Sequence, residues 1–197
     1  GSIYDFNEIK KIKTLCDKHN IMLHLDGARL WNALVETDLK TNDYGDVFDT
    51  ISLCFSKGLG CPVGSILVGN EEKINKALRI RKILGGGMRQ SGYLASAAIF
   101  AIENQIEDLK KDHIKAKEIG NVLEKLNFIK KVEPVSTNII IFSLIEEIDQ
   151  NYFINKMKEN NIFIISLGNN KLRIVTHRDY TDNHHNYFLS TIKKIKF

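Results

Sequence analysis

The sequence predicts an α/β protein, and two patterns along the chain carry that prediction. Short apolar runs of strand length alternate with longer segments that repeat apolar residues every three or four positions, as amphipathic helices do. Strands that alternate with helices are typical of an α/β fold. The predicted strands of the first half are 21–25, 49–56 and 63–69. With 197 residues, the chain is long enough to bury a core.

The first half begins with a predicted helix at 3–20, whose apolar face carries Phe6, Ile9, Ile12 and Leu15. The strand at 21–25 is mostly apolar, so we expect it to be covered on both faces. Helices are predicted at 29–39 and 71–84, and a short helical or turn segment at 42–48. The residues expected to face inward from 71–84 are Ile74, Ala77, Leu78 and Ile80. Three glycines, 85–87, end that helix before an alanine-rich one.

The second half repeats the alternation with more charge. Helices are predicted at 106–126, 152–160 and 181–195. Strands are predicted at 137–144, 162–166 and 171–176, with a turn at 168–170. We therefore expect two domains, one of residues 1–110 and a smaller one of residues 111–197.

Composition excludes several classes of protein. The apolar fraction of 43% and the charged fraction of 26% are ordinary for a globular protein. The net charge of +4 is spread along the chain, whereas a nucleic-acid site needs a clustered basic stripe. No apolar run approaches the ~18 residues of a membrane span. The three cysteines lack metal or redox spacing, which predicts reduced thiols in a cytoplasmic protein. The adjacent His184 and His185 diverge on a helix, so we expect no metal site.

Two residues at strand ends suggest cofactor chemistry. Asp26 follows the strand at 21–25, where functional acids gather in open α/β sheets; it could equally cap a helix beginning at Ala28. Lys57 follows the strand at 49–56 and precedes two glycines, which allow the backbone to approach a ligand. A lysine for a Schiff base and an acid for the ring nitrogen are the protein groups that pyridoxal 5'-phosphate (PLP) requires. The simpler alternative for Lys57 is a solvated loop lysine.

Further motifs make the pattern more specific. The sequence reads His-Leu-Asp-Gly-Ala-Arg at 24–29 and Ser-Lys-Gly-Leu-Gly at 56–60. It continues with Pro-Val-Gly-Ser at 62–65, Gly-Gly-Gly-Met-Arg-Gln-Ser-Gly at 85–92 and Leu-Arg-Ile-Val-Thr-His at 172–177. In this order the motifs resemble the low-specificity L-threonine aldolases, a group of β-eliminating lyases among the fold-type I PLP enzymes. The resemblance implies the carboxyl-terminal part of an aspartate aminotransferase-like large domain, followed by a smaller α+β domain.

The resemblance also implies a role for each matching residue. Lys57 would be the catalytic residue that binds PLP covalently, and Asp26 would pair with its ring nitrogen. Arg29 would lie beside cofactor and substrate, and Arg173 would hold the substrate carboxylate. Two further cations would support the site from the subunit boundary, namely Lys82 and Arg89.

The implied reaction is the cleavage of L-threonine or L-allo-threonine to glycine and acetaldehyde. Two alternatives stay open: another fold-type I lyase or transferase, and an inactive fragment that acts only as an oligomerising module. Family members are longer at the amino end, where the phosphate-binding loop lies. We therefore expect a missing amino-terminal part, weak or no PLP binding by this chain alone, a small amino-acid substrate and a homo-oligomer.

Overall fold

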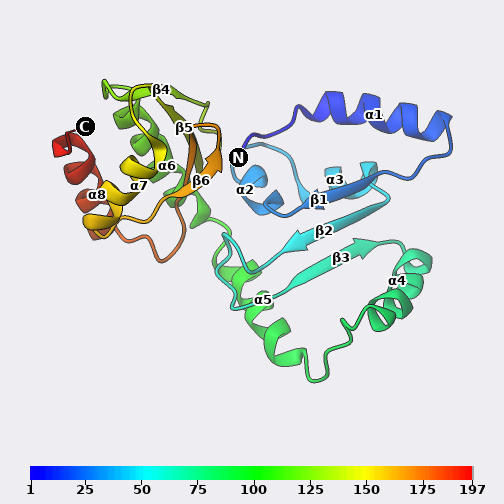
Figure 1. The fold of residues 1–197 in the computed structure, drawn as a ribbon. Coiled ribbons are helices and arrows are strands. Elements are labelled where there is room, and N and C mark those ends of the chain that lie inside the picture. The colour runs from blue at the N-terminus through cyan, green and yellow to red at the C-terminus, as the bar shows by residue number, and fades with distance from the viewer. Residues whose placement is uncertain (197) are drawn as a thin grey trace. The chain divides into compact units, whose positions relative to one another are not determined.

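The computed structural model describes residues 1–196, which form two compact units (Figure 1). The first unit is Tyr4–Glu107, and the second contains Asp108 and the residues that follow it, together with Gly1–Ile3. The division between the units thus falls close to residue 110. The assignment of 1–110 and 111–197 as a cofactor domain and a small domain stays a prediction.

The first unit is built on a three-stranded sheet with the order β1-β2-β3. These strands are β1 (His24–Gly27), β2 (Thr50–Cys54) and β3 (Ser65–Gly69). β1 runs parallel to β2, with Asp26 opposite Ser52, and β3 runs antiparallel to β2. β2 and β3 therefore form a hairpin across the glycine- and proline-containing turn. The helices are α1 (Phe6–Lys18), α2 (Leu30–Leu34), α3 (Thr41–Val47), α4 (Glu71–Ile83) and α5 (Gly92–Asn104).

The core of the first unit is small, and several burial predictions for it are wrong. Leu30, Tyr44 and Ile51 form the buried cluster. The segment before β1 is not covered on both faces, because Met22 is 72% exposed. α4 buries none of its residues, and Leu78 is 47% exposed. Amphipathic spacing predicted α4 correctly, but only part of its apolar face is covered within the described residues: Ile74 is half buried, whereas Ile80 is 55% exposed.

α2 is shorter than the helix predicted at 29–39. It ends at Leu34, with Val35 as its C-cap residue. Val35 and Thr37 are β-branched and lose side-chain freedom in a helix, which lowers their helix propensity. Thr37 instead donates its hydroxyl hydrogen to the carbonyl oxygen of Ala33 at 3.0 Å. Leu30 and Trp31 are both buried.

The second unit contains a four-stranded antiparallel sheet with the order β4-β5-β7-β6. Its strands are β4 (Ile129–Val132), β5 (Ile139–Leu144), β6 (Ile165–Gly168) and β7 (Lys171–Val175). The sequence did not predict β4, where Lys130 and Lys131 interrupt the apolar pattern. Asn169 and Asn170 connect β6 to β7 with φ of 49° and 56°, as a two-residue hairpin turn requires. The predicted turn at 168–170 is thus confirmed.

The helices of the second unit pack a much larger core beside this sheet (Figure 1). They are α6 (Leu109–Leu123), α7 (Gln150–Glu159) and α8 (Asp182–Lys194). Ile119, Phe153 and Ile192 are fully buried. Gly120 allows close packing within α6, since a Cβ atom there would lie 2.9 Å from Cγ2 of Val135. None of the helices in residues 1–196 is long and apolar enough to cross a membrane.

Candidate functional site

Asp26 lies near the carboxyl end of β1, and its side chain is exposed. Its Oδ1 accepts a hydrogen bond from the backbone N–H of Ala28 at 3.2 Å. The N-cap position of α2 is occupied by Arg29, so the alternative in which Asp26 caps that helix is wrong. Gly27 lets the strands approach closely, because a Cβ atom there would lie 2.8 Å from the backbone oxygen of Ser52. Asp26 is therefore a carboxylate on a tightly packed strand end.

Lys57 lies on an anchored loop that follows β2. Its backbone oxygen accepts a hydrogen bond from the N–H of Gly60 at 2.9 Å, and Gly60 has a φ of 72°. Phe55 and Leu59, on either side of Lys57, are 7% and 1% exposed. The carbonyl of Gly64 accepts a hydrogen bond from the N–H of Phe55 at 3.0 Å and closes the base of the loop. The buried anchors hold the backbone while the lysine side chain stays exposed.

Cys61 is one of these anchors rather than a nucleophile. Its side chain is buried, and its Sγ lies 3.6 Å from the carbonyl oxygen of Ala97. Burial raises the pKa of the Cys61 thiol, which disfavours the reactive thiolate.

The parallel pairing of β1 and β2 brings Asp26 and Lys57 to the same edge of the sheet. The carboxyl ends of parallel strands lie together, and Asp26 and Lys57 lie at or just beyond those ends. The rings of Trp31 and Phe55 stack at 6.4 Å, which joins α2 to the Lys57 loop. Arg29 is half buried and occupies the N-cap position of α2, on the segment that follows β1.

Lys82 and Arg89 lie on the two sides of the triple glycine, and both are exposed. Gly85 has a φ of +82°, and Gly87 folds back on Lys82: a Cβ atom there would lie 2.9 Å from Cδ of Lys82. The glycines therefore form a tight turn packed against Lys82. The supporting role of Lys82 and Arg89 at the cofactor site stays a prediction.

Arg173 lies on β7 in the second unit, opposite Ile165 of β6 and Ile141 of β5. Its Nε is buried and has no hydrogen-bond partner within residues 1–196. It lines a cavity of about 470 Å³ within this unit. The other five predicted site residues belong to the first unit.

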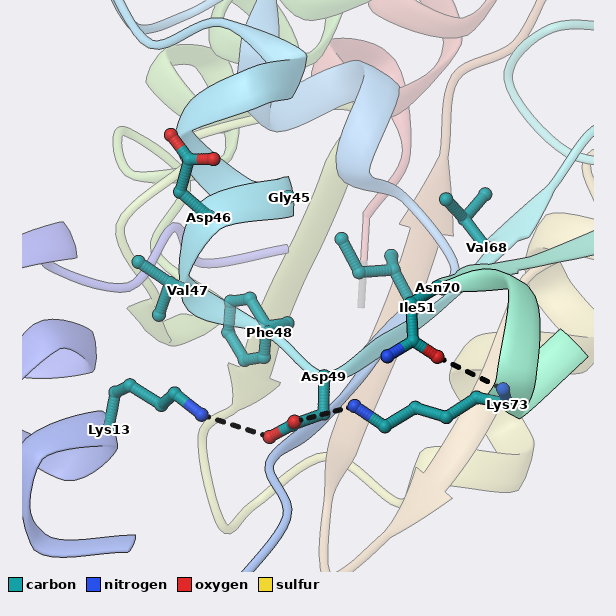
Figure 2. Close-up of a pocket in the computed structure, with 11 residues that line it drawn as sticks. Lys13, Gly45, Asp46, Val47, Phe48, Asp49, Ile51, Val68, Asn70 and Lys73 are labelled. Atoms are coloured by element: carbon teal, nitrogen blue, oxygen red, sulfur yellow. Dashed lines mark hydrogen bonds and ion pairs between the residues drawn. The ribbon is translucent and has the colours of Figure 1, made fainter. Parts of the chain in front are cut away.

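A second cavity, of about 360 Å³, contains a charged cluster that the sequence did not reveal (Figure 2). Asp49 accepts hydrogen bonds from Nζ of Lys73 at 2.8 Å, the backbone N–H of Leu23 at 2.9 Å and Nζ of Lys13 at 3.0 Å. These contacts, that of Lys73 first, hold the pKa of Asp49 well below its usual range. Asp49 precedes β2, at the opposite end from Lys57. The cluster therefore ties α1 and α4 to the sheet.

Comparison with known proteins identifies the family. The model of the beta-eliminating lyase family matches residues 1–147. The chain belongs to this family. It is 41% identical over 174 residues to a low-specificity L-threonine aldolase of Candida albicans, covering 88% of this chain and 44% of the relative. A low specificity L-threonine aldolase of Escherichia coli is 36% identical, and the match covers 91% of this chain and 52% of that relative.

The chain also shares its fold with solved structures. A Leishmania major threonine aldolase superposes with a TM-score of 0.79 at 20% sequence identity, covering 98% of this chain and 57% of that one. The predicted fold class is thus confirmed as an α/β part of a fold-type I enzyme. The chain spans about half the length of the relatives that it matches.

Proposed function

We propose that this chain forms part of a PLP-dependent enzyme that cleaves L-threonine and L-allo-threonine to glycine and acetaldehyde. The observation that carries the proposal is the placement of Asp26 and Lys57 at the adjoining carboxyl ends of β1 and β2. The names of the relatives support the choice of reaction.

The residues present fit the proposed cofactor. Lys57 would hold the aldehyde carbon of PLP through its amine, which its buried loop anchors would keep in place. Asp26, whose Oδ1 already accepts one backbone hydrogen bond, would use its carboxylate to hold the ring nitrogen protonated. When bound, PLP supplies the electron sink for the pair released as the Cα–Cβ bond breaks.

The remaining residues would bind and orient the substrate. Arg173 would hold the carboxylate of the amino acid, because a guanidinium can donate two parallel hydrogen bonds to it. Arg29, next to the strand end that carries Asp26, would orient cofactor and substrate. Lys82 and Arg89 would add positive charge at the rim. In the family that the motifs resemble, the active sites are built between subunits. We therefore also propose that the chain forms a homo-oligomer.

Binding of PLP tests the cofactor site directly. The chain is titrated with PLP while the visible absorption band of the lysine-bound cofactor is measured. A phosphate group contributes much of such binding, and the residues before Asp26 include no glycine-rich phosphate loop. We therefore expect a weak band in the wild-type chain that disappears in Lys57→Ala and persists in the control variant Lys18→Ala, another exposed lysine of the first unit. An equal band in wild type and Lys57→Ala would contradict the role of Lys57.

The reaction is tested by combining this chain with the amino-terminal half of a relative. The chain is produced together with the amino-terminal half of the Escherichia coli relative, and acetaldehyde is measured with L-threonine and with L-allo-threonine. Release that depends on both polypeptides and on Lys57 is expected. Transamination without acetaldehyde would replace the aldolase proposal with another PLP reaction.

A further inference from the structure

One face of the three-stranded sheet carries polar side chains. Leu25, Ile51 and Leu53 pack into the buried cluster of the first unit, and strand alternation places the residues between them on the opposite face. On β1 and β2 these polar-face residues are His24, Asp26, Thr50, Ser52 and Cys54. Each of them is exposed or half buried. Asp26 therefore shares its face of the sheet with polar residues of the neighbouring strand.

The parallel register arranges these side chains in rows across the two strands. His24 lies opposite Thr50, and Asp26 lies opposite Ser52. Neighbouring strands are about 4.8 Å apart, so the side chains of one row are within reach of each other. The first row shows such a contact, because Nδ1 of His24 lies 2.8 Å from Oγ1 of Thr50. The same backbone spacing places the side chain of Ser52 beside that of Asp26.

Ser52 has hydrogen-bonding capacity left for this row. Its Oγ lies 3.5 Å from the backbone oxygen of Leu25. A typical hydroxyl hydrogen bond measures about 2.5–3.0 Å, so this contact is long. A serine side chain has three staggered rotamers, and its hydroxyl can turn toward Asp26 while the strand stays in place.

The carboxylate of Asp26 can accept a further hydrogen bond. Its Oδ1 accepts one from the N–H of Ala28 at 3.2 Å, and an ionised carboxylate has about four acceptor positions. The bond from Ala28 comes from the segment that follows Asp26. A second bond from the adjacent strand would restrain the carboxylate from another direction. A hydroxyl that donates to a carboxylate also favours the ionised form, which is the form that attracts a protonated ring nitrogen.

We propose that Ser52 is a positioning residue, whose hydroxyl holds the carboxylate of Asp26 in a single orientation. The inference rests on the proposed function, in which Asp26 pairs with the ring nitrogen of PLP. In this role Ser52 touches neither cofactor nor substrate and acts only through Asp26.

The orientation of Asp26 can be measured in the PLP-free chain. Three-bond NMR couplings from Cγ of Asp26 to its backbone nitrogen and carbonyl carbon report the rotamers about the Cα–Cβ bond. Ser52→Thr keeps the hydroxyl, whereas Ser52→Val has nearly the same shape as threonine and lacks it. We expect the couplings of one rotamer in the wild type and in Ser52→Thr, and rotamer-averaged couplings in Ser52→Val.

The matched control is Ser65→Val, which changes a serine of β3 opposite Cys54 and should leave the couplings of Asp26 at their wild-type values. If Ser52→Val does not fold, Ser52→Ala takes its place. Averaged couplings in the wild type, or equal couplings in the variants with and without the hydroxyl, would overturn the proposal.

A cofactor analogue separates positioning from a purely structural role. This chain is combined with the amino-terminal half of the Escherichia coli relative, and binding of PLP is compared with binding of the analogue in which carbon replaces the ring nitrogen. Ser52→Val should weaken PLP binding about tenfold, as for the loss of a hydrogen bond to a charged group, and change binding of the analogue less than about twofold. Equal weakening of both compounds would overturn the proposal. Absence of PLP binding by the wild-type pair would refute the proposed cofactor role instead, while the couplings still decide whether Ser52 orients Asp26.

Discussion

The rings of Trp31 and Phe55 stack with centroids 6.4 Å apart and an angle of 27° between their planes. Trp31 follows the Asp26 strand end, and Phe55 precedes Lys57 by two residues. This contact therefore couples the two segments that carry the proposed cofactor residues. Trp31 is also the single tryptophan of the chain, so its fluorescence reports on this contact.

Removing the Phe55 ring should unfold the Lys57 loop more readily. Phe55 is 7% exposed, and truncation of a buried phenylalanine to alanine typically costs about 3–5 kcal/mol. Phe55→Ala should lower the free energy of unfolding by about that amount, measured by urea titration followed by Trp31 fluorescence. The control is Phe100→Ala, because Phe100 is 57% exposed and its loss should change stability by less than about 0.5 kcal/mol. Similar effects in the two variants would contradict the anchoring role of Phe55.

Substitution of Gly27 should separate β1 from β2. A Cβ atom at Gly27 would lie 2.8 Å from the backbone oxygen of Ser52, and the backbone cannot yield without disturbing the ladder. Gly27→Ala should therefore destabilise the chain by about 1–3 kcal/mol, as overpacking does. In contrast, Gly45 lies in α3 with open space around it. Gly45→Ala should raise the free energy of unfolding by up to about 1 kcal/mol. Urea titrations of both variants measure the difference, and a neutral Gly27→Ala would contradict the close approach.

The charge of Asp49 should stabilise the first unit in a pH-dependent way. Its pKa is lower in the folded chain than in the unfolded chain, so its contribution is present at neutral pH and is lost as the pH falls through the acidic range. Asp49→Asn should be less stable than wild type by about 1–3 kcal/mol at pH 7, since it removes charged hydrogen bonds. The difference in unfolding free energy between the wild type and Asp49→Asn should narrow below about pH 4. Urea titrations at several pH values measure it, and a gap that stays constant with pH would show that the charge of Asp49 is not responsible.

In the complemented enzyme, Arg173→Lys should separate substrate binding from cofactor binding. A lysine keeps the positive charge but cannot form the two-pronged contact with a carboxylate. We expect KM for L-threonine to rise about tenfold, as for the loss of one charged hydrogen bond, while the visible absorption band of the cofactor is unchanged. Arg178→Lys is the matched control and should alter neither quantity. A KM that stays at the wild-type value would remove Arg173 from the substrate site.

The sequence predicted the local features of the fold well, because they depend on neighbouring residues. The strand ends that carry Asp26 and Lys57 follow from short apolar runs and from glycine spacing, and the turn at 168–170 follows from its glycine and asparagines. The structure adds buried anchors at Phe55 and Leu59 on either side of Lys57, whose own side chain is exposed.

Features that depend on distant residues could not be predicted. Amphipathic spacing in α4 identifies an apolar face but not whether another element covers it, so Leu78 was wrongly expected to be buried. Asp49 meets Lys13 and Lys73 only through the packing of separate helices against the sheet. The cavity at Arg173 is lined by segments that are separate in the chain, from Asn161 to Phe188, so no local pattern reveals it.

The assignment of Gly1–Ile3 to the second unit has a consequence for chain connectivity. Thr137 donates its hydroxyl hydrogen to the backbone oxygen of Gly1 at 2.8 Å, which fixes this short segment on the second unit. The first unit is therefore an insertion whose two ends both lead into the second. To complete the second unit, the chain must close a loop of roughly a hundred residues, at an entropic cost that grows with loop length. A first unit that is already folded shortens that loop, so folding of the inserted unit favours completion of the one that encloses it.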